Sequence, residues 1–242
     1  MSGGGGIAGA PTATQSAALD PKAAVMRRRA LYDIAFVLLV VQSYVWFWNR
    51  LFDGGVFVVA ALVLGTAIRS GHRRGEGLRD IGIRFDNFLP ALRDAAVVTV
   101  PMCALIIIWG LWVERLRPDW MIVVNRLPWL VCWGFLQQFV LQGFVHRRFM
   151  EILGTTRERE LATGLYFALC HLPNPRLMAA TFVSGWIWAV LYRRNPNLIA
   201  IALSHAAGSA SLNIAFGPEM LRGMRVGMGY LTYRHIPGPI IR

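Results

Sequence analysis

The chain has 242 residues, of which 55% are hydrophobic and only 16% are charged, and its mean hydropathy is +0.46. Several apolar runs approach the roughly 20 residues that a helix needs to cross a bilayer, which argues against a soluble domain. The formal net charge of +12 does not favour nucleic-acid binding, because the basic residues form short clusters between apolar runs, as in loops that flank membrane spans. We therefore expect an integral membrane protein surrounded by lipid, with no nucleic-acid partner.

The amino-terminal stretch is rich in Gly, Ala and Thr and has almost no bulky apolar residues. We predict that residues 1–26 form a disordered tail. Arg27, Arg28 and Arg29 then precede the first apolar run, as in a signal anchor. Lys22 is the only lysine among the cationic residues, a bias that suggests a GC-rich bacterial genome, so we expect a multi-pass protein of a bacterial inner (plasma) membrane.

Apolar runs suited to membrane helices recur along the rest of the chain. They lie at about residues 31–48, 54–68, 95–113, 127–146, 161–172, 177–192 and 197–216. The predicted fold is therefore all-α: a polytopic transmembrane helical bundle of about seven spans at residues 27–216. Lys and Arg concentrate in the segments that a cytoplasmic N-terminus leaves in the cytoplasm, so we predict that orientation.

Two segments fall outside these runs. Residues 77–96 (GLRDIGIRFDNFLPALRDAA) mix apolar and charged side chains, a pattern that indicates an interfacial segment leading into the third span. Residues 217–242 fit no clear span, and we assign them to a carboxy-terminal tail.

Polar residues from three predicted spans lie at a similar depth. Counting from the cytoplasmic ends of the spans, Gln138, His171 and His205 each lie eight to ten residues in, which is roughly 12–15 Å at 1.5 Å per residue. Gln142 lies four residues after Gln138 and shares its helix face. A single glutamine in a span more often bonds two helices together, and a single histidine is as often structural as functional. The agreement of three helices in depth favours a functional cavity.

The order of these residues resembles the motifs of the CAAX-protease and bacteriocin-processing family of intramembrane glutamic endopeptidases, which are EExxxR, FxxxH and HxxxN. Phe167 and His171 match the second motif, and His205 matches the histidine of the third, with Ser209 in place of asparagine. The resemblance covers residues 75–216, where it implies a protease-like core.

The first motif departs from the family pattern. Its two glutamates are replaced by Gln137 and Gln138, and its arginine by Gln142. In the family, the first glutamate and the FxxxH histidine are thought to activate a water, and the last histidine and asparagine to stabilise the oxyanion. An amide does not accept a proton near neutral pH. No other carboxylate replaces the glutamates, because Glu151 lies past the span end and Asp33 far back on the first span.

The resemblance implies an intramembrane endopeptidase that acts on membrane-anchored or lipidated peptides without a metal or other cofactor. Its catalytic positions would be Gln137, Gln138, His171 and His205, with Gln142, Phe167 and Ser209 in support. Because glutamines replace the glutamates, we expect impaired or altered activity. The alternative is a non-catalytic membrane protein that binds an embedded peptide or lipidated tail in the same cavity.

A metal site or small transporter is a third reading of the two histidines. His171 and His205 are only two good ligands, whereas catalytic zinc normally takes three protein ligands. His146 would have to reach from the cytoplasmic end of its span to become the third, so we do not expect a metal.

Overall fold

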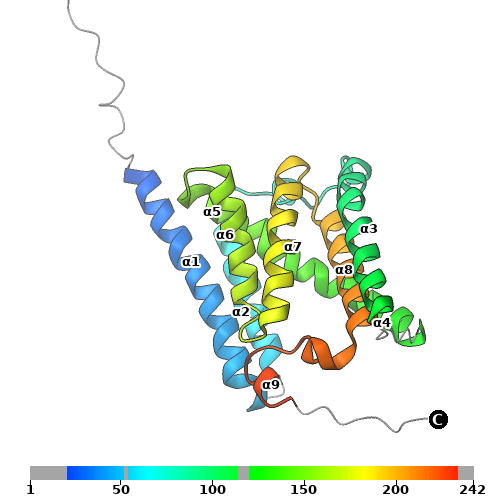
Figure 1. Ribbon diagram of the computed structural model, residues 1–242. Coiled ribbons are helices and arrows are strands. Elements are labelled where there is room, and N and C mark those ends of the chain that lie inside the picture. Colours follow the sequence, from blue (N-terminus) through cyan, green and yellow to red (C-terminus); the bar gives the residue numbers. More distant parts are fainter. Residues whose placement is uncertain (1–20, 52–53, 114–119, 234–242) are drawn as a thin grey trace, which may run out of the picture.

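The computed structural model describes residues 21–51, 54–113 and 120–233, and these residues form helices and turns without a strand (Figure 1). The all-helical prediction is therefore confirmed. The elements in chain order are α1 (Pro21–Trp46), η1 (Trp48–Arg50), α2 (Gly55–His72), α3 (Phe88–Trp112), α4 (Trp120–Gln138), η2 (Phe139–His146), α5 (Arg147–Ile152), α6 (Thr156–Leu169), α7 (Pro175–Arg194), α8 (Leu198–Met220), η3 (Arg222–Met224) and α9 (Gly227–Leu231).

Four stretches of the described chain are long and apolar enough to cross a membrane: residues 21–50, α2, α3 and residues 198–216 of α8. The continuous unit α4–η2–α5, together with α6 and α7, accounts for the other predicted spans, although these helices are shorter or more polar. A count of seven spans and a cytoplasmic N-terminus therefore stay predictions.

The chain ends differ from the predicted boundaries. The helix α1 begins at Pro21, inside the segment predicted as a tail, and residues 1–20 lie outside the described residues. At the other end, η3 and α9 lie within the predicted carboxy-terminal tail, and residues 234–242 lie outside the described residues.

Side-chain caps determine where three of the helices begin. Thr155 and Glu158 form a capping box, so α6 begins at Thr156, five residues before the predicted span. Asn174 caps α7 by accepting from the Leu177 amide, and Asn197 caps α8 by accepting from the Ala200 amide. The polar first turns of α6 explain why apolar runs alone placed its start too late.

The segment between α2 and α3 contains turns and no helix, and it docks on the α7–α8 turn. The Asn197 side-chain amide donates to the Arg84 carbonyl at 2.8 Å and to Oδ1 of Asn87 at 2.9 Å. Phe85 points outward and is 79% exposed, as an interfacial side chain would be. The Arg84 guanidinium, which is hydrogen-bonded to Asp86, lowers the pKa of that carboxyl to about 2.

A close helix contact sets the position of α6 against α7. A Cβ added at Gly164 would lie 2.6 Å from the Phe182 carbonyl oxygen, and one added at Gly185 would lie 3.2 Å from the Gly164 Cα and from the Phe167 Cβ. Small residues allow such close approach of membrane helices. This contact fixes the end of α6 that carries the FxxxH motif.

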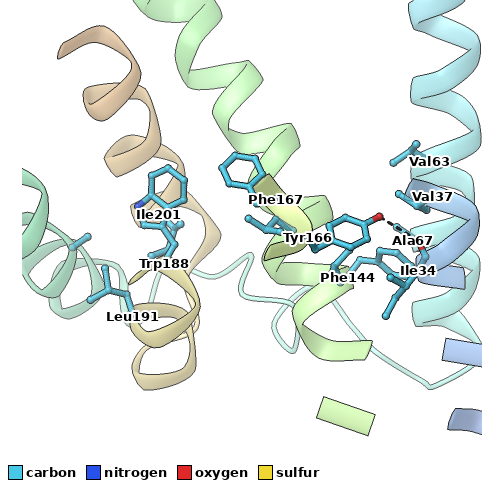
Figure 2. Close-up of a cluster of buried hydrophobic side chains, with 13 residues drawn as sticks. Ile34, Val37, Val63, Ala67, Phe144, Tyr166, Phe167, Trp188, Leu191 and Ile201 are labelled. Carbon is cyan, nitrogen blue, oxygen red and sulfur yellow. Dashed lines mark hydrogen bonds between the residues drawn. The ribbon is translucent and has the colours of Figure 1, made fainter. Parts of the chain in front are cut away.

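A buried apolar cluster joins the helices around that motif (Figure 2). Its larger side chains come from α1, α2, η2, α6, α7 and α8: Ile34, Val37, Val63, Phe144, Tyr166, Phe167, Trp188, Leu191 and Ile201. The Tyr166 hydroxyl donates to the Ile34 carbonyl at 3.3 Å. Because lipid is as apolar as these side chains, the cluster stabilises the bundle through close packing more than through removal from water.

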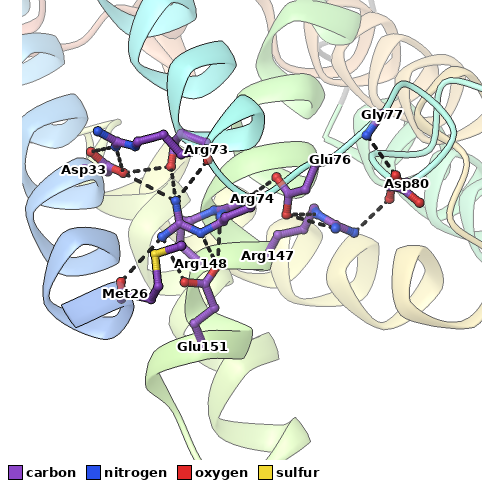
Figure 3. A network of polar contacts seen from close by, with 11 residues as sticks. Met26, Asp33, Arg73, Arg74, Glu76, Gly77, Asp80, Arg147, Arg148 and Glu151 are labelled. Atoms are coloured by element: carbon purple, nitrogen blue, oxygen red, sulfur yellow. Dashed lines mark hydrogen bonds and ion pairs between the residues drawn. The ribbon is translucent and has the colours of Figure 1, made fainter. Parts of the chain in front are cut away.

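A network of ion pairs joins the start of α1, the end of α2 and α5 (Figure 3). Arg74 donates to Glu151 at 2.7 Å, and Arg73 donates to Asp33 at 2.9 Å. Arg148 is fully buried between Glu76 and Glu151. Both acids that sequence analysis excluded from the site, Asp33 and Glu151, have their partners here.

Candidate active site

A cavity of about 810 Å³ lies inside the bundle. Its walls are mostly apolar and come from α1, α2, α3, α4, η2, α6, α7 and α8, with Cys170 and His171 from the turn after α6 and Met224 and Val226 from the segment after α8. The contributions of α1 and α2 come from Val41 to Val45 and from Val56 to Leu64. These are the ends of α1 and α2 away from the ion-pair network, so the cavity and the network occupy opposite halves of the bundle.

Both motif histidines reach this cavity. Gln137, His171, His205 and Ser209 all line it, and Phe167 forms part of the same wall. The ring of Phe167 contacts both imidazoles edge-on, with centroid separations of 4.7 Å to His171 and 5.9 Å to His205. One aromatic ring therefore brings the second and third motifs together.

The hydrogen bond of His171 determines which of its ring nitrogens keeps a lone pair. Its Nδ1 lies 2.7 Å from the Phe167 carbonyl oxygen. A carbonyl only accepts, so Nδ1 carries the proton in the neutral ring and Nε2 is left as an acceptor. His171 lies in the turn after α6, which ends at Leu169. The depth predicted for His171 assumed a helix that continues past this residue, so that count does not apply to it.

His205 has the opposite arrangement. Its Nδ1 lies 3.0 Å from the amide nitrogen of Gln138, which donates, so Nε2 carries the proton and is a donor. Trp188 stacks on the ring at a centroid separation of 4.7 Å and an interplanar angle of 25°. The two histidines therefore offer an acceptor and a donor to one cavity.

The hydroxyl groups of Ser204 and Thr99 hold Trp188 in place. Its indole nitrogen donates to Ser204 Oγ at 2.9 Å, and Ser204 Oγ lies 2.6 Å from Thr99 Oγ1. Sequence analysis missed all three residues, since a tryptophan, a serine and a threonine in apolar helices carry no motif. The only available signal was that Ser204 directly precedes His205.

The three glutamines occupy different places. Gln137 lines the cavity, and Gln138 is fully buried behind it against His205. Gln142 is also fully buried, is not among the cavity-lining residues, and forms no side-chain hydrogen bond with any described residue. Gln137 can therefore contact a substrate, and Gln138 orients His205. Gln142 does neither.

The described residues place no carboxylate on the cavity wall. They also contain no group of three or more His, Cys, Asp or Glu side chains with the geometry to hold a metal ion. His146 bonds to Thr163 Oγ1 at 2.9 Å, away from the other two histidines. The wall offers two imidazoles and one side-chain amide, together with a thiol at Cys170 and several hydroxyl groups, which belong to Tyr44, Tyr166, Thr181, Ser184 and Ser209.

Residues 118–211 match the family model described as Rce1-like, type II CAAX prenyl endopeptidase. The matched range contains all three motif positions, from Gln137 to Ser209, and supports the resemblance drawn from them. No curated protein and no solved structure matches the chain.

Proposed function

We propose that this membrane protein is an intramembrane endopeptidase, a proposal supported by the match of residues 118–211 to the Rce1-like type II CAAX prenyl endopeptidase model. Its substrates are membrane-anchored or lipidated peptides, and its activity is impaired or altered because the motif glutamates are glutamines. The observation that carries the proposal is the pairing of an acceptor, Nε2 of His171, with a donor, Nε2–H of His205, on one cavity wall.

In the proposed reaction, the scissile carbonyl lies between the two imidazoles. Nε2 of His171 accepts a proton from a water, whose oxygen attacks the carbonyl carbon. Nε2–H of His205 donates to the oxyanion that forms, and Ser209 lies on the same wall. The proton on His171 then passes to the leaving amine, so the products are a carboxylic acid and an amine.

The proposed role of Gln137 follows from the chemistry of its amide. The amide oxygen accepts a hydrogen bond from the attacking water and orients it, but does not take its proton. General-base help is typically worth about 10²–10⁴-fold in rate. A site in which His171 is the only base is therefore expected to be slower than one with a glutamate beside it.

Substrate access from the bilayer is supported by two lining residues. Val56 on α2 and Trp133 on α4 both line the cavity, and they are 36% and 37% exposed. This partial exposure supports an opening of the cavity at these two helices. We propose that an anchored peptide enters laterally there, in a multi-pass protein of the bacterial inner membrane with a cytoplasmic N-terminus.

A non-catalytic role is the second candidate function, and the lack of a carboxylate on the described cavity wall favours it. In that role the same wall binds an embedded peptide or lipidated tail without cleaving it. Both functions share the cavity and differ only in whether a peptide bond is broken.

The experiment that separates them uses the full chain in liposomes with a panel of lipidated and unmodified transmembrane peptides. Slow cleavage of some peptides that is abolished in His171→Ala supports the endopeptidase. Thr66→Val is the matched control, because Thr66 is a buried polar residue on α2 whose hydroxyl bonds to its own helix and which is not among the residues that line the cavity. Peptide binding without cleavage in every variant supports the binding role.

A further inference from the structure

A file of buried polar side chains runs along the unit formed by α4, η2 and α5. Gln138, Gln142 and His146 recur at intervals of four residues, and each is at most 1% exposed. The π-helical turn η2, Phe139–His146, contains the last two. Such π-helical turns are rare and frequently occur at functional sites.

Several polar atoms along this file have no protein partner. Neither the amide nitrogen nor the amide oxygen of Gln142 is hydrogen-bonded to any described residue, and Oε1 of Gln138 is likewise unpaired. Buried polar groups that lack a protein partner usually bind ordered water, which typically makes about three hydrogen bonds. The donor and acceptor atoms of one amide suit such a ligand.

The two ends of the file have defined partners. At one end, Gln138 bonds to His205 at the cavity wall. At the other, His146 bonds to Thr163 Oγ1, which itself donates to the Arg159 carbonyl at 2.7 Å. The hydroxyl proton is thus committed, so Nδ1–H of His146 donates to Thr163 and its Nε2 is free to accept.

The file also runs toward the charged end of the bundle. His146 is followed directly by Arg147 and Arg148, which belong to the ion-pair network. Along the helix, Gln142 lies between His146 and Gln138, the residue that bonds to His205. The file therefore connects the cavity wall at His205 with the ion-pair network.

We propose that Gln142, with Oε1 of Gln138, forms a buried water-binding site that links the charged end of the bundle to His205. The ligand is water, held by the side-chain amide of Gln142 and by Oε1 of Gln138. Its use rests on the proposed function: hydrolysis consumes one water for each peptide bond, and a site at Gln142 would deliver water from the charged end to a cavity whose walls are mostly apolar.

The site is tested first by an experimental structure of the full chain at a resolution that resolves ordered water. We expect at least one water within hydrogen-bond distance of the Gln142 amide. An amide bonded only to protein atoms, or enclosed in a dry apolar site, would overturn the proposal. This readout does not depend on peptidase activity.

The second test is Gln142→Leu, which removes both amide groups at similar volume. If water satisfies the amide, the melting temperature should stay unchanged or fall, because the water loses its partners; a clear rise would show a dry, unsatisfied amide and overturn the site. Thr66→Val gives the effect of deleting a buried polar group bonded within its own helix.

Activity then separates the two proposals. We expect Gln142→Leu to lower the cleavage rate about tenfold with peptide affinity unchanged. Ordered water at Gln142 in a chain that cleaves nothing would leave the water site standing and remove the proposed function. Cleavage that is unchanged in Gln142→Leu would overturn the supply role and leave the endopeptidase standing.

Discussion

The amide nitrogen of Gln138 lies 3.0 Å from Nδ1 of His205, and both side chains are buried. This contact makes a glutamine at a motif glutamate position the residue that keeps the proton on Nε2 of His205. The predicted donor of the site thus depends on an amide, and a carboxylate at the same position would act differently.

Gln138→Glu tests this dependence. A carboxylate only accepts, so it would draw the proton of neutral His205 to Nδ1 and leave Nε2 without a hydrogen. We expect the ¹⁵N chemical shifts of His205 to report the change of tautomer, and any peptidase activity to fall, since the oxyanion loses its donor. Unchanged shifts would show that the amide does not control the ring. Gln138→Met is the matched uncharged control.

Gln137→Glu tests the missing base. Because Gln137 lines the cavity that His171 also lines, a carboxylate there would stand beside the attacking water. We expect faster cleavage of membrane-anchored peptides, up to about 10²–10⁴-fold, measured against wild type in the same liposomes. The gain should vanish when His171→Ala is added. A faster variant that no longer needs His171 would contradict the assigned base.

Sequence analysis placed the histidines relative to the cavity better than it placed the glutamines. His171, His205 and Ser209 come from separate elements, and motif order alone brought them to one wall. Sequence analysis placed Gln142 on the helix face of Gln138, and both side chains are fully buried, but of the three glutamines only Gln137 lines the cavity. A helical count shows which side chains share a face, but it does not show which face the neighbouring helices cover.

The helix ends were also predicted less well than the helices themselves. Apolar runs predicted the bundle, whereas the start of α6 came from the polar pair Thr155 and Glu158. The segment after α8 showed no periodicity, yet Met224 and Val226 line the cavity. Backbone contacts hold that segment: the Gly227 amide donates to the Leu172 carbonyl at 2.7 Å. This contact depends on the positive φ of Gly227 and on the position of the Leu172 carbonyl. A pattern of apolar and polar side chains predicts neither.

Asn174→Ala tests that segment. The Asn174 side-chain amide donates to the Leu221 carbonyl at 2.9 Å and to the Arg225 carbonyl at 3.2 Å. Removing it leaves two carbonyls unpaired and also removes the cap of α7, which typically costs about 1 kcal/mol. We expect faster proteolytic cutting after α8 in detergent. Thr66→Val, whose hydroxyl donates only to the Leu62 carbonyl within α2, should leave the cutting rate unchanged.

The buried arginine of the ion-pair network gives a stability prediction. Arg148 donates to Glu76 and Glu151 with its side chain 1% exposed. Arg148→Met leaves Glu76 with Arg147 and Glu151 with Arg74 as their remaining partners, so we expect a loss of stability near or below the lower end of the about 3–5 kcal/mol that breaking a fully buried pair typically costs. The measurement is thermal stability, which should fall. Arg79→Ala, whose side chain is 71% exposed beside Asp86, should change stability little, since exposed pairs contribute about 0–1 kcal/mol.

The contact of α6 with α7 gives the last prediction. An added Cβ at Gly164 would lie 2.6 Å from the Phe182 carbonyl oxygen, so Gly164→Ala must move α6 away from α7. Overpacking of this kind typically costs about 1–3 kcal/mol, and here it also displaces Phe167, which contacts both histidines. We therefore expect a lower melting temperature together with weaker peptide binding. Gly65→Ala on α2 is the matched control, because its Cβ would meet nothing within 4 Å and alanine favours the helix by about 1 kcal/mol. Equal effects of the two substitutions would show that the α6–α7 contact does not position the site.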